Sequence, residues 1–287
     1  MWAKIEADGP QEQPRVITFA VAMDRYLREV MPSKSPTTQR IQGYQAAKLR
    51  EVFGHMPLAA ITGTHIGQYL DQSPAPIVAN REIGLASHLF TKSIRWGYLN
   101  INPTLGVERH KEKARTRYIS DAELAALVRH AEPAVRTAVL LAYYTAQRIG
   151  DLLGLRWKDV DTETLRFVQD KTGAVVVVGV DHLIEQVLGM VDRDPRSDFV
   201  IQNTKGQQYA YHAFAARFRK CCELAQLPGI HFHDIRAKAA TDMDEDEAQP
   251  RDIQALLGHK NAAMTERYIK THKQRTVKPV GRAVRGV

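Results

Sequence analysis

The sequence is poor in cysteine and has no long apolar run. Its two cysteines, Cys221 and Cys222, are adjacent, so they lack the CxxC spacing of metal sites and would be strained as a disulfide. No stretch approaches the roughly 20 apolar residues that span a bilayer, and the first six residues lack the apolar core of a signal peptide. We therefore expect reduced thiols, no membrane partner and a cytoplasmic location.

Acidic residues are outnumbered. The 287 residues include 40 Lys and Arg against 32 Asp and Glu, a formal net charge of +8. Such a balance favours a polyanionic partner such as nucleic acid, although an ordinary solvated surface explains the charge alone equally well. The length suits two domains, and 44% hydrophobic residues exclude a disordered chain.

The first half of the chain is predicted to be helical. A polar lead-in covers 1–16, and apolar residues then recur at threes and fours over 17–30, 37–53, 64–70 and 77–96. These four helices form a domain over 17–108. Its basic residues are either phosphate contacts or solvated charges: Lys34, Arg40, Lys48, Arg50, Arg81, Lys92 and Arg95.

A basic run, R-H-K-E-K-A-R-T-R, covers 109–117. It looks too polar to pack and is predicted to be an interdomain linker, which either follows a nucleic-acid groove or is a soluble hinge. Ser120 and Glu123 then have the spacing of a capping box, which predicts a new helix and a second domain over 118–287.

The second domain is predicted to contain one β-hairpin among helices. Helical periods cover 135–144, 183–190 and 209–224, a short strand or turn falls at 198–201, and β-branched alternation over 165–169 and 174–180 places Lys171 in a hairpin turn. Arg217, Arg219 and Lys220 on the last helix are further candidates for a DNA-facing surface. The fold class is thus mainly α with a small β-sheet.

Several polar residues stand out, each with an ordinary alternative. Lys171 has the position of a solvated turn lysine. His231 and His233 have H-x-H spacing but no third zinc ligand nearby in sequence, His259 has the pattern of a core histidine, and Tyr268 lies at helical spacing from apolar neighbours. Taken singly, none of them indicates a function.

Together, these segments resemble the tyrosine recombinases, the phage integrase family. The stretch 145–161, T-A-Q-R-I-G-D-L-L-G-L-R-W-K-D-V-D, is similar to the family box that carries its first catalytic arginine, here Arg148. Ala146 replaces the usual glycine and Asp151 the usual glutamate. H-D-I-R at 233–236 and L-L-G-H at 256–259 match two further boxes, and Tyr268 follows His259 by nine positions. The resemblance covers nearly the whole chain from residue 17.

The resemblance implies a helical core-DNA-binding domain followed by an α+β catalytic domain. It implies that Arg148 and Arg236 clamp a phosphate, that Lys171 is the general acid, and that His233 and His259 assist. Tyr268 is then the nucleophile that forms a 3′-phosphotyrosyl link, without a metal ion or cofactor. The basic segment 269–287 is expected either to be a free tail or, from 277–284, to dock on a neighbouring protomer.

The expected partners are duplex DNA attachment sites, three further copies in a homotetramer on DNA, and accessory DNA-bending or directionality proteins, in a bacterial cell or a phage-infected host. Phage-type integration and excision is the preferred function. The alternatives are an Xer-like resolution recombinase, a type IB topoisomerase-like enzyme, and a catalytically silent DNA-binding relative. The residues before the first helix are too few for the separate arm-binding domain that many members of the family carry.

Overall fold

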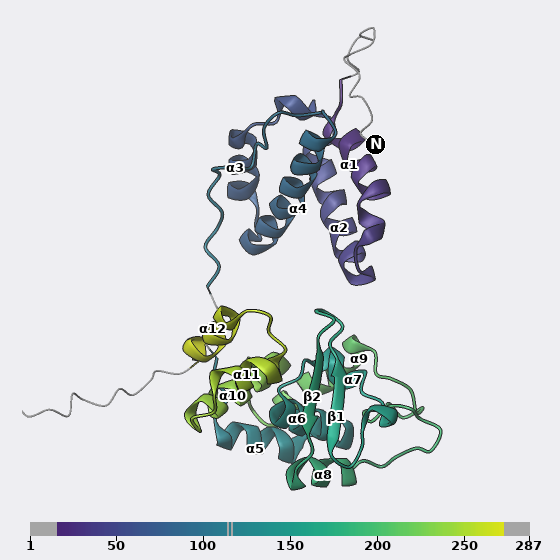
Figure 1. Cartoon of the computed structure of the whole chain (residues 1–287). Helices are drawn as coiled ribbons and strands as arrows, with labels where there is room; N and C mark the ends of the chain where they lie inside the picture. The colour runs from purple at the N-terminus through teal and green to yellow at the C-terminus, as the bar shows by residue number, and fades with distance from the viewer. Residues whose placement is uncertain (1–15, 114, 116, 273–287) are drawn as a thin grey trace, which may run out of the picture. The chain divides into compact units, whose positions relative to one another are not determined.

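The computed structural model describes residues 16–113, 115 and 117–272, except for the side chains of Arg267, Tyr268 and 270–272 (Figure 1). The chain divides into two compact units, Met1–Lys113 and Ala114–Val287. The boundary falls within the predicted linker. The predicted lead-in up to residue 15 and the predicted tail segment 277–284 lie outside the described residues.

The first unit is helical, as predicted. Its helices are α1 (Phe19–Glu29), α2 (Pro36–Phe53), α3 (Gly63–Gln72) and α4 (Pro76–Arg95), with the short 3₁₀ turns η1 (Met31–Ser33) and η2 (Leu58–Ala60). Thr18 and Ser35 cap α1 and α2 through their hydroxyl oxygens, while proline occupies the first position of α2 and α4. The inward faces of the helices form one apolar core, which includes Phe19, Phe53 and Phe90.

The described residues of the predicted linker are mostly exposed and none is buried, but several of their polar groups have partners in the two units. The backbone amide of His110 donates to Asn80 Oδ1 on α4 at 3.1 Å, and Glu112 pairs with Arg81 at 2.6 Å. Arg115, by contrast, belongs to the second unit and pairs with Asp234 at 2.6 Å. An exposed polar segment is thus attached to its neighbours by hydrogen bonds and ion pairs.

The second unit is α+β. Its helices are α5 (Asp121–His130), α6 (Pro133–Thr145), α7 (Ile149–Leu153), α8 (His182–Gly189), α9 (Tyr211–Leu224), α10 (Phe232–Glu245), α11 (Pro250–Leu257) and α12 (Ala262–His272), with a 3₁₀ turn η3 (Trp157–Asp159). The predicted capping box is present at α5: the Ser120 hydroxyl accepts from the Glu123 amide, and the Glu123 carboxylate accepts from the Ser120 amide. Segment 198–201 contributes an isolated bridge between Phe199 and Arg156.

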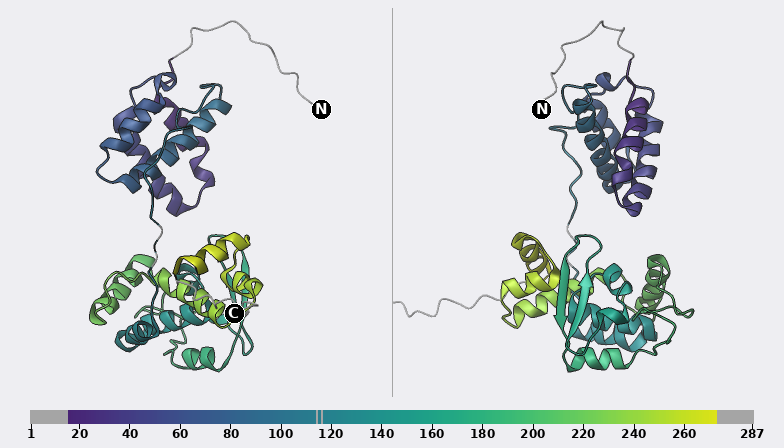
Figure 2. Two further views of the ribbon diagram at one scale, coloured as in Figure 1. Left: turned by 90° about the vertical axis from the view of Figure 1, so that its left-hand side faces the viewer. Right: turned by 45° about the vertical axis from the view of Figure 1, so that its right-hand side comes forward.

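The β-hairpin forms as predicted from β1 (Thr164–Val168) and β2 (Val175–Gly179), paired antiparallel. Leu165 lies opposite Val178 and Phe167 opposite Val176, and this face packs on the core. In the right-hand view of Figure 2 the hairpin stands between the α10–α12 group and the rest of the unit, with α11 beside β2. Lys171 lies in its turn.

The helices α10, α11 and α12 pack together, and α10 also lies against α6. Small side chains allow this close approach: Ala146, Ala239 and Ala240 form an apolar cluster with Ile253 and Leu257. The cluster brings the end of α6 next to α10 and α11. Among the described residues, no helix is both long enough and apolar enough to cross a membrane.

Candidate active site

Four of the six predicted site residues line one open hollow of about 480 Å³, which we call the arginine hollow. Arg148 caps α7, Lys171 comes from the hairpin turn, and His233 and Arg236 lie in the first turns of α10. Segments nearly ninety residues apart in sequence therefore supply one concentration of positive charge. Low-dielectric walls around such a concentration strengthen its attraction for an anion.

Arg236 is the most deeply buried of these residues, with 1% of its surface exposed. Its Nη1 donates to the carbonyl of Ala146, and its Nη2 donates to the carbonyl of Leu257 at 2.6 Å. These two carbonyls end α6 and α11, where helices leave acceptors unsatisfied. The guanidinium is thus fixed by backbone geometry.

Arg148 is held differently. Its Nη1 donates to Oε1 of Gln169 at 2.6 Å, while the nearest carboxylate oxygen, on Asp151, is 3.9 Å away. Gln169 is fully buried, and its amide nitrogen donates to Gln147 Oε1 at 2.9 Å and to the Leu257 carbonyl at 3.2 Å. Gln169 is therefore the closest described partner of Arg148, with Asp151 as a more distant ion-pair partner, and Gln169 also contacts the carbonyl that anchors Arg236.

His259 lies behind Arg236, and its Nε2 is 3.4 Å from Arg236 Nη2. Burial first, and then the charges of Arg236 and Arg148, lower the pKa of His259 to about 4. The imidazole is neutral at pH 7. Because Arg236 can only donate, Nε2 is the acceptor and Nδ1 donates to Thr265 Oγ1 at 3.1 Å.

His233 lies at the edge of the arginine hollow with part of its ring exposed. Desolvation by the surrounding chain, and then the neighbouring Arg236, lower its pKa as well. Both imidazoles are therefore uncharged at neutral pH. The positive charge of the site comes from Arg148, Arg236 and Lys171.

Tyr268 lies in α12, and its side chain is outside the described residues. The backbone of α12 packs against α10 and α11, which carry or directly precede His233, Arg236 and His259. Thr265, one turn before Tyr268 on the same helix, is buried against His259. The helix that carries the predicted nucleophile thus packs against the segments that form the site.

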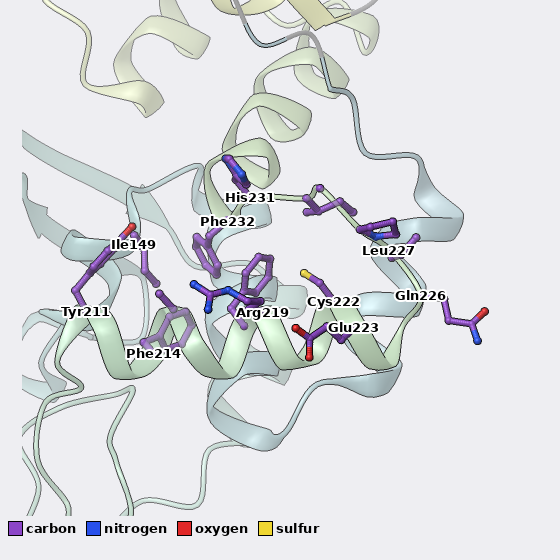
Figure 3. A pocket seen from close by; sticks show the side chains of 15 residues that line it. Ile149, Tyr211, Phe214, Arg219, Cys222, Glu223, Gln226, Leu227, His231 and Phe232 are labelled. Atoms are coloured by element: carbon purple, nitrogen blue, oxygen red, sulfur yellow. The ribbon is translucent and has the colours of Figure 1, made fainter. Parts of the chain in front are cut away.

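A larger hollow of about 610 Å³ adjoins the arginine hollow and shares Ile149, Tyr211, His231 and Phe232 with it. Figure 3 shows Phe214, Arg219 and Cys222 extending from α9 into this second hollow. Its aromatic lining contrasts with the cationic lining of the arginine hollow. Burial raises the pKa of the Cys222 thiol to about 11, which keeps it protonated and unreactive.

The model of the family described as "Phage integrase family" matches residues 117–275. The chain belongs to the phage integrase family. A putative integrase/recombinase of Haemophilus influenzae is 24% identical over 92% of this chain and 89% of its own length. The shufflon-specific DNA recombinase of Escherichia coli is 27% identical over 90% of this chain and 70% of its own length.

Solved structures of this family share the fold. A lambda integrase dimer bound to a COC′ core site matches with a TM-score of 0.79 at 21% identity, over 93% of this chain and 81% of that chain. The Tn1549 transposon integrase matches with a TM-score of 0.74 at 14% identity, over 91% of this chain and 96% of that chain. The predicted family, the predicted fold class and the predicted enzyme class, a site-specific tyrosine recombinase, are confirmed.

The two departures of this chain from the family pattern have local structural consequences. Ala146, which replaces glycine, adopts the left-handed conformation with φ 49° at the end of α6. Asp151, which replaces glutamate, accepts the Asp170 amide at 3.0 Å through Oδ1, so it supports the hairpin turn. Its other oxygen has no hydrogen-bond partner among the described residues, and burial raises the pKa of this carboxyl.

Sequence reasoning missed Gln147 and Gln169, although a signal for Gln169 was present. Leu165, Phe167 and Gln169 alternate along β1 and just beyond it, so the strand period places Gln169 on the buried face. A polar residue on an apolar face, two positions before Lys171, marks a buried hydrogen-bonding group. No group of three or more metal-ligating side chains occurs among the described residues, so the H-x-H pair has no third ligand there.

Proposed function

We propose that this recombinase cuts and rejoins duplex DNA at its attachment sites through a covalent 3′-phosphotyrosyl intermediate, with Tyr268 as the nucleophile. The observation that carries the proposal is the convergence of Arg148, Lys171, His233 and Arg236 on one hollow. Helix α12, which bears Tyr268, packs against the helix that supplies two of them. In-line attack on a phosphodiester needs this combination of clamped phosphate and positioned phenol.

The proposed roles follow from charge and geometry. Arg148 and Arg236 present planar guanidinium donors to the non-bridging phosphate oxygens, whose charge grows in the transition state. Lys171 gives a proton to the leaving 5′-oxygen as the phenolic oxygen bonds to phosphorus. The neutral imidazole of His233 accepts or relays the phenolic proton, and His259 supports Arg236 from behind.

Rejoining is the reverse reaction. The 5′-hydroxyl of a partner strand attacks the phosphotyrosyl bond and releases Tyr268, so the bond energy is conserved and no nucleotide cofactor is consumed. In this proposal the guanidinium groups supply the charge that metal ions supply elsewhere. Cleavage is therefore expected to proceed in the presence of EDTA.

Exchange between two duplexes requires four active sites, so a homotetramer on DNA is the proposed assembly. A lambda integrase tetramer bound to a Holliday junction, 20% identical to this chain, supports this arrangement. Phage-type integration and excision inside a bacterial cell is the preferred role, with accessory DNA-bending proteins as predicted partners. Curated integrases from phages HK022 and lambda are among the relatives that favour it over Xer-like resolution.

The deciding experiment traps the intermediate. The protein is incubated, with EDTA, with a nicked duplex that carries its attachment site, and the covalent adduct is detected on a denaturing gel. Wild type is expected to form an adduct that Tyr268→Phe abolishes. Tyr144→Phe is the matched control, because the Tyr144 hydroxyl forms no described hydrogen bond and lies in the same unit.

Two outcomes overturn parts of the proposal. An adduct that survives in Tyr268→Phe contradicts the assigned nucleophile, whereas the absence of any adduct in wild type favours the catalytically silent relative. Relaxation of supercoiled DNA without intermolecular products favours the topoisomerase-like alternative. A strict requirement for magnesium or zinc contradicts the assignment of charge stabilisation to the arginines.

A further inference from the structure

Gln169 occupies the junction of three segments that the active site needs. Its amide oxygen accepts from Arg148 Nη1 at 2.6 Å and from Thr172 Oγ1 at 2.9 Å. Its amide nitrogen donates to Gln147 Oε1 and to the Leu257 carbonyl. One buried side chain therefore connects the segment that carries Arg148, the turn that carries Lys171 and the end of α11.

The chemistry of these partners leaves the amide one orientation. Arg148 can only donate, whereas the Leu257 carbonyl can only accept. A flipped amide would therefore place its nitrogen against the Arg148 donor and its oxygen against the Leu257 carbonyl. The Leu257 carbonyl also accepts from Arg236 Nη2 at 2.6 Å. Arg148 and Arg236 are thereby joined through one amide and one carbonyl.

Gly258 lies against the Gln169 side chain, where a larger residue would not fit. Its φ of 60° is left-handed, and a Cβ placed there would lie 2.6 Å from Gln169 Nε2 and 2.7 Å from Oε1. Any larger residue at position 258 would displace the glutamine side chain. The glycine before His259 therefore leaves the space that Gln169 fills.

We propose that Gln169 is a positioning residue, which holds the Arg148 guanidinium for the phosphate and couples it to the Lys171 turn and to the anchor of Arg236. The amide is neutral, so it orients Arg148 without cancelling its charge. A carboxylate in the same place would form an ion pair with Arg148 and compete with the phosphate. This inference rests on the proposed function.

The test compares DNA affinity with the single-turnover rate of adduct formation. Gln169→Leu removes all four hydrogen bonds at similar volume, and Gln169→Glu keeps an acceptor for Arg148 but adds charge. Both variants are expected to bind DNA within about threefold of wild type. Both are expected to form the adduct about a hundredfold more slowly, the usual consequence of a misplaced catalytic group.

Gln202→Leu is the matched control, because Gln202 also makes one amide-to-carbonyl bond, to Asp192 at 2.9 Å, away from the arginine hollow. Its rate is expected to equal that of wild type. All rates are measured well below each variant's unfolding temperature. A Gln169→Leu rate within about threefold of wild type overturns the positioning role, and a near-normal Gln169→Glu rate overturns the requirement for a neutral acceptor.

A second variant guards against failure to fold. Gly258→Ala places a methyl group against the Gln169 amide while the glutamine itself is unchanged. Gly97→Ala introduces the same left-handed backbone strain at a position where no atom lies within 4 Å of the added Cβ. Slower cleavage in the first and normal cleavage in the second support the inference, whereas equal rates contradict it. If wild type itself forms no adduct, the proposed function fails instead, so the two failures are distinguishable.

Discussion

Two buried cations lie two residues apart on α10, and the structure holds them in opposite ways. Lys238 Nζ contacts carboxylate oxygens of Asp121 at 2.5 Å and Asp242 at 2.8 Å. Arg236, facing the arginine hollow, is held by backbone carbonyls. The first arrangement neutralises a charge within the fold, while the second orients a charged guanidinium at the wall of the arginine hollow.

Several basic residues elsewhere in the chain pair with carboxylates as Lys238 does. In the helical unit, Arg25 pairs with Glu29 and Arg81 with Glu112. In the recombinase unit, Arg217, a candidate for the DNA-facing surface, pairs with both carboxylate oxygens of Glu132. These cations contact carboxylates at 3.0 Å or less, whereas Arg236 donates to backbone carbonyls.

The largest expected effect comes from substitution of Arg236, which is held by backbone carbonyls. Arg236→Lys keeps the charge but cannot donate to both carbonyls, so the adduct rate is expected to fall at least about a hundredfold. Unsatisfied carbonyls should also destabilise the protein by about 1–3 kcal/mol. Single-turnover cleavage and urea unfolding measure the two effects.

Arg217→Lys is the matched control for this substitution. The exposed Arg217–Glu132 pair contributes less than about 1 kcal/mol, and its replacement should leave the adduct rate unchanged. The proposed distinction fails if the two variants lose activity equally.

Lys238→Met tests the buried cation that is paired with carboxylates. Desolvation opposes the charge of this lysine, but Asp121 and Asp242 together raise its pKa, so it is a stable ion-pair partner. Its loss leaves the Asp242 carboxylate without its cation, at a cost of about 3 kcal/mol. Below the unfolding temperature the adduct rate should stay within about threefold of wild type. A selective loss of cleavage by a fully folded variant would place Lys238 in the site.

The neutral state of His259 predicts a pH dependence of stability. Its folded pKa of about 4 lies below the unfolded value of about 6.5, so the unfolded chain binds the extra proton first. This contribution is complete above pH 6.5 and is lost as pH falls towards 4, by about 3 kcal/mol. Urea unfolding at pH 7 and pH 4 should therefore show a smaller acid loss for His259→Gln than for wild type. Equal losses would contradict a neutral imidazole.

The helices of the first unit, the hairpin and the α5 capping box follow from local periodicity and cap residues, so the sequence predicted them closely. Helices α7, α10 and α11, which carry or flank most of the site, were not predicted as helices. The position of Lys171 followed from the hairpin. The sequence did not predict which polar groups distant in the chain would form hydrogen bonds with each other. Gln169 resembled the polar end of a strand, and Arg115 resembled part of a free linker, until tertiary contacts supplied Arg148 and Asp234 as their partners.

Ala146→Gly should have the smallest effect, and it isolates what anchors Arg236. Relief of the left-handed conformation favours glycine by about 1–2 kcal/mol, but loss of the buried methyl and greater freedom of the unfolded chain offset most of it. Stability should change by less than about 1 kcal/mol, and the adduct rate by less than about threefold, because the carbonyl of residue 146 holds Arg236. Ala146→Val, which strains the same backbone, should slow cleavage and lower the unfolding temperature together. A large rate change in Ala146→Gly alone would mean that the methyl group, not the carbonyl, sets the position of the arginine.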